Sequence, residues 1–179
     1  MSASLSEMPS MIPPSPWVVR HAQSIPARGK VLDLACGSGR HARFLAGLGY
    51  PVLAVDRDAG ALAGLSAIEG ITTRQLDLEG EEWPLAGQVF DGIVVTNYLW
   101  RPRLPDVLAL LAPGGALIYE TFMVGNAAYG KPSNPAFLFQ AGELRQLAAA
   151  AGLREVEYAE GYVASPKPAM RQAVCAIRD

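Results

Sequence analysis

Largely apolar residues occur along this chain in short runs that are separated by glycine turns and by segments with helical spacing. The runs at 31–34 and 52–55 lack the regular polar alternation of half-exposed strands, which is typical of buried parallel strands. Between them, apolar residues share one face of a helix that Gly49 is placed to end. The stretch 31–57 is therefore predicted to form a strand, a glycine turn, a helix and a second strand.

The alternation of strands and helices continues to the C-terminus. Ser15 and Pro16 are residue types that begin helices, as N-cap and first helical residue. Further strands are predicted at 71–78, 90–97, 116–121, 153–158 and 173–177, and further helices after Asp58, from Leu104 to Leu111 and from Glu143 to Ala151. This order predicts an α/β layered sheet in which the last two strands form an antiparallel pair.

One long segment, 122–140, interrupts this order. It is rich in glycine and proline and shows no regular hydrophobic period. A loop of this length inside a compact domain is usually functional or disordered. Its aromatic residues favour a functional role.

Length and composition favour one globular domain. The 179 residues are enough for one well-buried domain and too few for two ordinary ones. We expect residues 1–14, a mixture of Ser, Met and Pro, to form a flexible leader and residues 15–179 to form a single domain. Half of the residues are hydrophobic and 18% are charged, and the net charge of −2 offers no basic footprint for nucleic acid or an anionic membrane.

Several further classes of protein are disfavoured by the sequence. No apolar run is long enough to cross a bilayer and no secretory signal is recognisable, so a cytoplasmic protein is expected. Cys36 and Cys175 lie in apolar surroundings, which predicts buried thiols rather than a disulfide. The two histidines, His21 and His41, are too few and too far apart for a metal site, and His41 is predicted to be a surface or packing residue.

The candidate chemistry begins at the glycine turn. Gly37 and Gly39 let backbone N–H groups approach a nucleotide-like ligand at a helix N-terminus. Asp56 closes the second strand, where such folds hold the hydroxyls of a ribose. The same pattern satisfies a dinucleotide fingerprint, so an NAD-dependent oxidoreductase stays open as an alternative, as does a cofactor-binding module without catalysis. Asp33 lies inside an apolar strand and therefore has to be hydrogen-bonded.

Several motifs together resemble those of class I S-adenosylmethionine-dependent methyltransferases. They are Asp33-Leu-Ala-Cys-Gly37-Ser-Gly39, Asp56, Asp77, Phe90-Asp91 and Leu111-Ala-Pro-Gly-Gly115. The resemblance covers roughly residues 30–160, and TNYLWRP with YETF…NP…GEL also resembles a small bacterial branch of the tellurite-resistance type. It implies a Rossmann-like, seven-stranded, mostly parallel sheet of order 3-2-1-4-5-7-6 with helices on both faces, and S-adenosyl-L-methionine as cofactor.

The resemblance also assigns a cofactor site. Gly37 and Gly39 would face the cofactor, Asp56 the ribose, Asp77 with the Leu78 backbone the adenine edge, Asp33 the methionine end and Arg40 the cofactor carboxylate. The implied cofactor-binding residues are Asp33, Gly37, Gly39, Arg40, Asp56, Asp77, Leu78 and Asn97. In one departure, Ala35 stands where the family's glycine triplet usually begins, and a methyl group there is expected to be tolerated.

The sequence predicts candidate residues for the acceptor site but not the acceptor itself. A methyl group on a sulfonium is already activated, so positioning is the main task and a base is needed only if the acceptor must lose a proton. No base is evident and the catalytic residue is left open. The acceptor-site candidates are Asn97, Tyr98, Trp100, Arg101, Tyr119, Glu120 and Tyr129, with Lys131, Asn134 and Phe137 from the long loop.

Two further observations narrow the acceptor class. Arg101 and Arg103 beside Trp100 could bind an anionic or aromatic small acceptor. They are explained equally well as solvent-exposed charged residues that precede a helix. Asn97-Tyr98 lacks the prolines of the carbonyl clamp in adenine-modifying enzymes, so methylation of adenine in nucleic acid is not predicted, and nucleic acid is the less favoured partner. The expected protein is a methyltransferase with a small-molecule acceptor.

Overall fold

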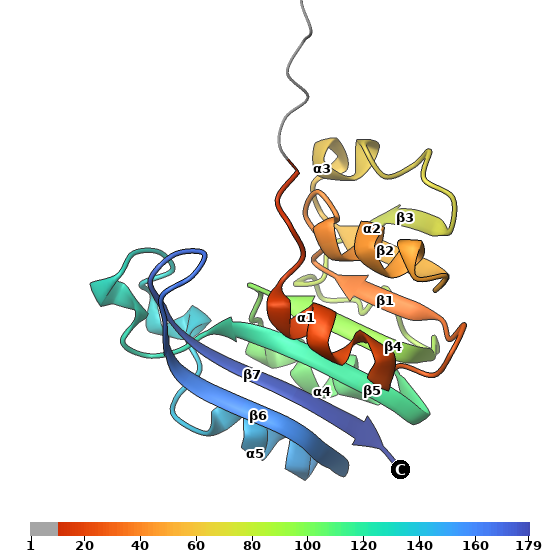
Figure 1. Ribbon diagram of the computed structural model, residues 1–179. Helices are drawn as coiled ribbons and strands as arrows, with labels where there is room; N and C mark the ends of the chain where they lie inside the picture. The colour runs from red at the N-terminus through yellow and green to blue at the C-terminus, as the bar shows by residue number, and fades with distance from the viewer. Residues whose placement is uncertain (1–10) are drawn as a thin grey trace, which may run out of the picture.

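A single mixed sheet forms the frame of the protein (Figure 1). The computed structural model describes residues 11–179, so the predicted leader lies mostly outside the described residues, and positions 11–14 have no regular secondary structure. The sheet has seven strands in the order β3-β2-β1-β4-β5-β7-β6, which confirms the predicted topology. The strands are β1 (Val31–Leu34), β2 (Val52–Asp56), β3 (Ile71–Gln75), β4 (Phe90–Thr96), β5 (Leu111–Phe122), β6 (Leu153–Val163) and β7 (Ala169–Arg178).

The first five strands pair in parallel, and β7 runs antiparallel to both of its neighbours. Four strands differ from the sequence prediction by more than one residue. The fifth strand begins earlier, at Leu111, because Leu111 pairs with Phe90 of β4 before the register shifts across the Pro-Gly-Gly motif and pairing resumes at Ala116. The last two strands are longer because they form one hairpin, and the third strand ends at Gln75, which leaves Asp77 in the loop that follows.

Helices and short 3-10 turns cover the two faces of this sheet. They are α1 (Pro16–His21), η1 (Ala22–Ser24), α2 (Arg40–Gly47), α3 (Ala59–Ala63), η2 (Arg101–Arg103), α4 (Leu104–Ala109), η3 (Asn126–Ala128), η4 (Pro135–Phe137) and α5 (Glu143–Ala150). The predicted caps are present, because Ser15 accepts a hydrogen bond from Trp17 N and Asp58 accepts one from Gly60 N. In residues 11–179, every helix is too short or too polar to cross a membrane.

Side-chain alternation along the strands creates two hydrophobic cores. Leu32 and Leu34 point to the face that α4 and α5 cover, whereas Val31 points to the face that α1, α2 and α3 cover. Figure 1 shows α1 lying across β5 on the second of these faces. The cores hold the C-terminal ends of the parallel strands at a common edge of the sheet.

The segment 122–140 is folded onto the β6–β7 hairpin, as Figure 1 shows. Asn126 fastens it at two points: its Oδ1 accepts a hydrogen bond from Met170 N at 3.0 Å, and its Nδ2 donates one to the Pro132 carbonyl. The ring of Tyr129 packs against that of Tyr162, with 5.3 Å between the centroids.

Arg101 ties the same segment to two helices. Its guanidinium donates two hydrogen bonds to the Glu143 carboxylate, at 2.7 and 2.8 Å. It also donates to the carbonyls of Ala136 and Leu138 at 2.8 and 2.7 Å. This ion pair holds the pKa of Glu143 below its usual value. Arg101 thus joins η2, the 122–140 segment and the start of α5.

Replacing this arginine tests its structural role. We expect Arg101→Gln to lower the free energy of unfolding by about 2 kcal/mol, because several charge-assisted hydrogen bonds are lost at a half-exposed site. The matched control is Arg145→Gln, which breaks a similar ion pair with Glu155. Because the Arg145 side chain is 52% exposed, this variant should lose much less stability than Arg101→Gln. Urea unfolding at pH 7 measures both variants, and equal losses would contradict the assignment.

Candidate functional site

The residues predicted to bind a cofactor meet at the C-terminal edge of the parallel strands. The glycine turn follows β1, Asp56 is the last residue of β2, Asp77 follows β3 and Asn97 follows β4. In open α/β sheets this edge is where ligands bind. The topology therefore brings together residues that are up to 64 positions apart in sequence.

The two turn glycines are required for different reasons. Both have left-handed backbone conformations, with φ of 54° at Gly37 and 79° at Gly39. A Cβ at Gly39 would come within 2.4 Å of Leu65, so packing also excludes a side chain there. A Cβ at Gly37 would meet no atom within 4 Å other than its own neighbours among the described residues. The space beside Gly37 is therefore open to a ligand.

Ala35 has the same backbone conformation without being glycine. Its φ is 53°, a left-handed value that costs an L-residue about 1–2 kcal/mol. A glycine here would relieve this cost, which explains physically why the related motif usually begins with glycine. The methyl group is accommodated at the price of local backbone strain.

Asp56 braces the glycine turn. Its Oδ2 accepts a hydrogen bond from Gly37 N at 2.8 Å, and its Oδ1 accepts one from Asp58 N at 2.9 Å. The carboxylate is only partly buried, so its outer lone pairs stay accessible. The ends of β1 and β2 are thereby joined directly at the predicted ribose site.

Asp33 lies below the turn and is almost completely buried. Its Oδ2 accepts a hydrogen bond from Ala42 N at 2.9 Å in α2, as the sequence required, whereas its Oδ1 has no partner among residues 11–179. Burial raises the pKa of Asp33 to about 7, although the bond from Ala42 and the positive charge of Arg40 act in the opposite direction. An unpartnered buried oxygen of this kind suits a cationic ligand group.

The other predicted cofactor residues lie around these two aspartates. Asp77 Oδ1 accepts a hydrogen bond from Glu79 N at 3.0 Å, which shapes the loop after β3. The Leu78 side chain is buried in the core that faces α4 and α5. Arg40 begins α2 and donates to the Pro13 carbonyl at 3.2 Å from an exposed position.

His41 is a packing residue, as expected. Its Nε2 accepts a hydrogen bond from Ser15 N at 3.0 Å, so the ring proton lies on Nδ1 and points to Thr96 Oγ1 at 3.3 Å. Burial lowers the pKa of His41 to about 3, which keeps the ring neutral. The neutral ring joins the start of α1 to the end of β4.

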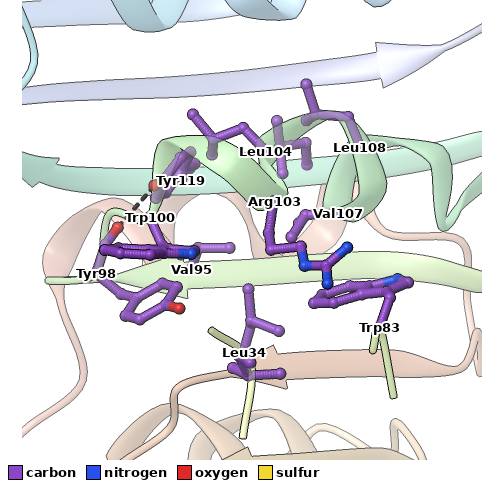
Figure 2. A pocket seen from close by; sticks show the side chains of 12 residues that line it. Leu34, Trp83, Val95, Tyr98, Trp100, Arg103, Leu104, Val107, Leu108 and Tyr119 are labelled. Carbon is purple, nitrogen blue, oxygen red and sulfur yellow. Dashed lines mark hydrogen bonds between the residues drawn. The ribbon is translucent and has the colours of Figure 1, made fainter. Parts of the chain in front are cut away.

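The acceptor candidates separate onto the two faces of the sheet. Tyr119 is buried on the α4 side, where its hydroxyl donates to the Tyr98 carbonyl at 2.6 Å (Figure 2). The adjoining cavity has a volume of about 10 Å³, room for one water molecule at most. It is lined by Leu34, Leu78, Trp83, Val95, Tyr98, Trp100, Arg103, Leu104, Val107, Leu108, Leu117 and Tyr119. This space belongs to the core rather than to a ligand site.

The candidates from the 122–140 segment lie with the β6–β7 hairpin or in local turns. Tyr129 packs on Tyr162, Asn134 accepts from Ala136 N at 3.0 Å, and Lys131 is within 3.5 Å of Ser133 Oγ. Phe137 is largely exposed. Arg101 serves the structural contacts described above, and the acceptor roles of these residues stay predictions.

Asn97 and Glu120 lie on the α2 side together with Arg171, a residue that sequence reasoning missed. Arg171 Nη2 donates to Asn97 Oδ1 at 2.7 Å, and its Nε lies 3.8 Å from Glu120 Oε2. The predicted last strand began at Ala173, which left Arg171 in a loop. The available signal was the predicted antiparallel topology, because extending β7 by a few residues places Arg171 opposite Phe122 at the end of β5.

A larger hollow of about 420 Å³ lies between residues 11–14 and the first turns of α2. Ser38, Arg40, Arg43 and Phe44 line its helix side. Arg40 is the one predicted cofactor-binding residue that lines this hollow, whereas Asp33, Asp56 and Asp77 do not line it.

Comparison with known proteins agrees with this architecture. Residues 31–115 match a family model described as a methyltransferase domain. Hemagglutinin 1 of Eikenella corrodens is 32% identical over 154 residues, which cover 80% of this chain and 50% of that protein. The chain spans about half the length of the curated relatives it matches.

Two solved structures share the fold. TehB from Haemophilus influenzae has a TM-score of 0.74 at 24% identity, with 90% of this chain and 61% of that chain covered. A 1,6-didemethyltoxoflavin-N1-methyltransferase from Burkholderia thailandensis, solved with S-adenosylhomocysteine and 1,6-didemethyltoxoflavin, has a TM-score of 0.68 at 23% identity, with 91% and 76% covered. Residues 31–115 thus match a methyltransferase domain, and the chain shares the seven-stranded fold of these two solved structures.

Proposed function

We propose that this chain transfers a methyl group from S-adenosyl-L-methionine to a small-molecule acceptor. The observation that carries the proposal is the contact between Gly37 N and the Asp56 carboxylate, together with the buried, unpartnered Oδ1 of Asp33 in the strand that leads to the turn. An open glycine turn, an acid at the end of β2 and a buried carboxyl then lie at the ligand edge of the sheet.

The residues present suit the cofactor. Asp56 would hold the ribose hydroxyls, and Asp77 with the Leu78 backbone the adenine edge. Asp33 and Arg40 would bind the ammonium and carboxylate of the methionine end, with Asn97 beside them. When bound, the cofactor supplies a methyl group already activated by the sulfonium. The chain's own task is then to orient the acceptor and exclude water.

An NAD-dependent oxidoreductase is the weaker proposal. The glycine turn and Asp56 would serve it equally well. It gives no role to Asp33 or Asp77. We also propose that residues 15–179 form one domain and that the protein acts in the cytoplasm, as the sequence predicts.

Asp56→Asn tests the ribose assignment. The amide can still accept a hydrogen bond from Gly37 N but loses the charge, so we expect S-adenosylhomocysteine to bind about 10–100-fold more weakly. Isothermal titration calorimetry measures the affinity, and Asp106→Asn, at an exposed carboxylate on α4, is the matched control. Unchanged affinity would refute the assignment, and binding of NADH but not of S-adenosylhomocysteine would replace the proposed function.

Asp33→Asn tests whether the Asp33 carboxylate binds the cofactor and whether its burial destabilises the folded protein. Because the folded-state pKa is raised above the unfolded value, the contribution of Asp33 to stability is lost as the pH rises from about 4 through about 7. The Asn variant has no such loss. Its free energy of unfolding should gain about 2 kcal/mol relative to wild type between pH 5 and pH 8.

Urea unfolding at the two pH values measures this difference, and calorimetry with S-adenosylhomocysteine should show weaker binding to the same variant. A stability difference that does not change with pH would contradict the expected ionisation of Asp33. If Asp33→Asn bound S-adenosylhomocysteine as tightly as wild type, Asp33 would have no role in binding the cofactor.

A further inference from the structure

Three polar side chains that the cofactor proposal leaves largely unused converge where β4 and β5 end and β7 begins. Asn97 follows β4, Glu120 lies near the end of β5, and Arg171 lies near the start of β7. Asn97 has a left-handed backbone with φ of 54°, and its N–H donates to the Glu120 carbonyl at 3.0 Å. The chain reversal after β4 therefore holds the Asn97 side chain against Arg171.

Arg171 is a mostly buried cation with few partners. Its side chain is 16% exposed, and its guanidinium lies over the ring of Phe122, 4.6 Å from the centroid. The bond to Asn97 Oδ1 is its one hydrogen bond to residues 11–179. Burial lowers the pKa of Arg171, and the charge of Arg40 acts in the same direction. A guanidinium in this position has free N–H donors for an anion.

Glu120 is similarly short of partners. Its side chain is 12% exposed, and its carboxylate accepts no hydrogen bond from the described residues. The 3.8 Å between Glu120 Oε2 and Arg171 Nε is too long for a hydrogen bond. The two side chains thus form an ion pair without a hydrogen bond, which leaves N–H donors of Arg171 and lone pairs of Glu120 for a further polar group.

Both charges lie next to the methionine end of the proposed cofactor site. Thr96, directly before Asn97, contacts His41 in the first turn of α2. Arg40 is close enough to act electrostatically on both Arg171 and Asp33. An acceptor bound by Glu120 and Arg171 would therefore lie at the same edge of the sheet as the glycine turn.

We propose that Glu120 and Arg171 bind the methyl acceptor, and that the acceptor is a small monocarboxylate with an amine or hydroxyl next to its carboxylate. This inference rests on the proposed function. Arg171 binds the carboxylate, and Glu120 accepts a hydrogen bond from the nucleophile. The negative charge of Glu120 favours a monoanion over a phosphate dianion, because it repels the second charge at short range.

Glu120 also receives the proton that the reaction releases. The bond from the acceptor nitrogen or oxygen to the methyl carbon forms as the carbon–sulfur bond breaks, and sulfur keeps that electron pair. The proton of the nucleophile passes to the Glu120 carboxylate. Glu120 is thereby a catalytic residue of the proposed reaction.

The test uses 2-aminobenzoate and 2-hydroxybenzoate, with their methyl esters as neutral counterparts. Calorimetry on protein saturated with S-adenosylhomocysteine should show the acids binding at least tenfold more tightly than the esters. Arg171→Gln should abolish this preference, and Arg171→Lys should restore part of it. Glu120→Gln should bind the acids within about threefold of wild type but form S-adenosylhomocysteine from S-adenosylmethionine at least tenfold more slowly.

The controls are Arg154→Gln and Glu155→Gln, which change exposed charges at the start of β6. Both should retain the preference for acids. Equal binding of acids and esters by wild type, or no binding of either, overturns the inference while S-adenosylhomocysteine binding upholds the proposed function. Loss of S-adenosylhomocysteine binding by wild type overturns both. If the Arg171 variants fail to bind S-adenosylhomocysteine, the binding of acids and esters by wild type decides whether the inference holds.

Discussion

The hydrogen bond from Gly37 N to the Asp56 carboxylate is the contact on which the site depends. It joins the turn after β1 to the end of β2, and the second oxygen of Asp56 holds the entry to α3. The turn keeps its shape because Gly39 packs against Leu65 and Gly37 is left-handed. A single carboxylate therefore sets the positions of two strand ends and one helix start.

Strict alternation of side chains along the strands decides what else can reach this site. Neighbouring residues of β5 point to opposite faces, so Tyr119 packs towards α4 whereas Glu120 lies on the α2 side with Arg171. After β4 ends at Thr96, the left-handed backbone of Asn97 separates two further neighbouring candidates. Tyr98 lines a core cavity, and Asn97, one residue earlier, contacts Arg171.

The sequence predicted most of the frame and part of the site. Strand order followed from the family resemblance, and the need for a hydrogen bond at Asp33 followed from an acid in an apolar strand. Arg171 and the contacts of Arg101 depend on long-range pairing, since Arg171 meets Asn97 across 74 positions. Local periodicity carries no information about such pairs, and strand ends, where Arg171 lies, are the boundaries that periodicity locates least well.

Two residues at this edge of the sheet lower the stability of the folded protein. Ala35 has a backbone conformation that favours glycine, and Asp33 buries a carboxyl whose pKa is raised to about 7. Neither cost improves packing, and both lie within a few residues of the open space beside Gly37. Strain and buried charge are tolerated where a ligand compensates for them. The partly partnered charges of Glu120 and Arg171 extend this pattern to the acceptor side, because a bound dipolar molecule would satisfy both.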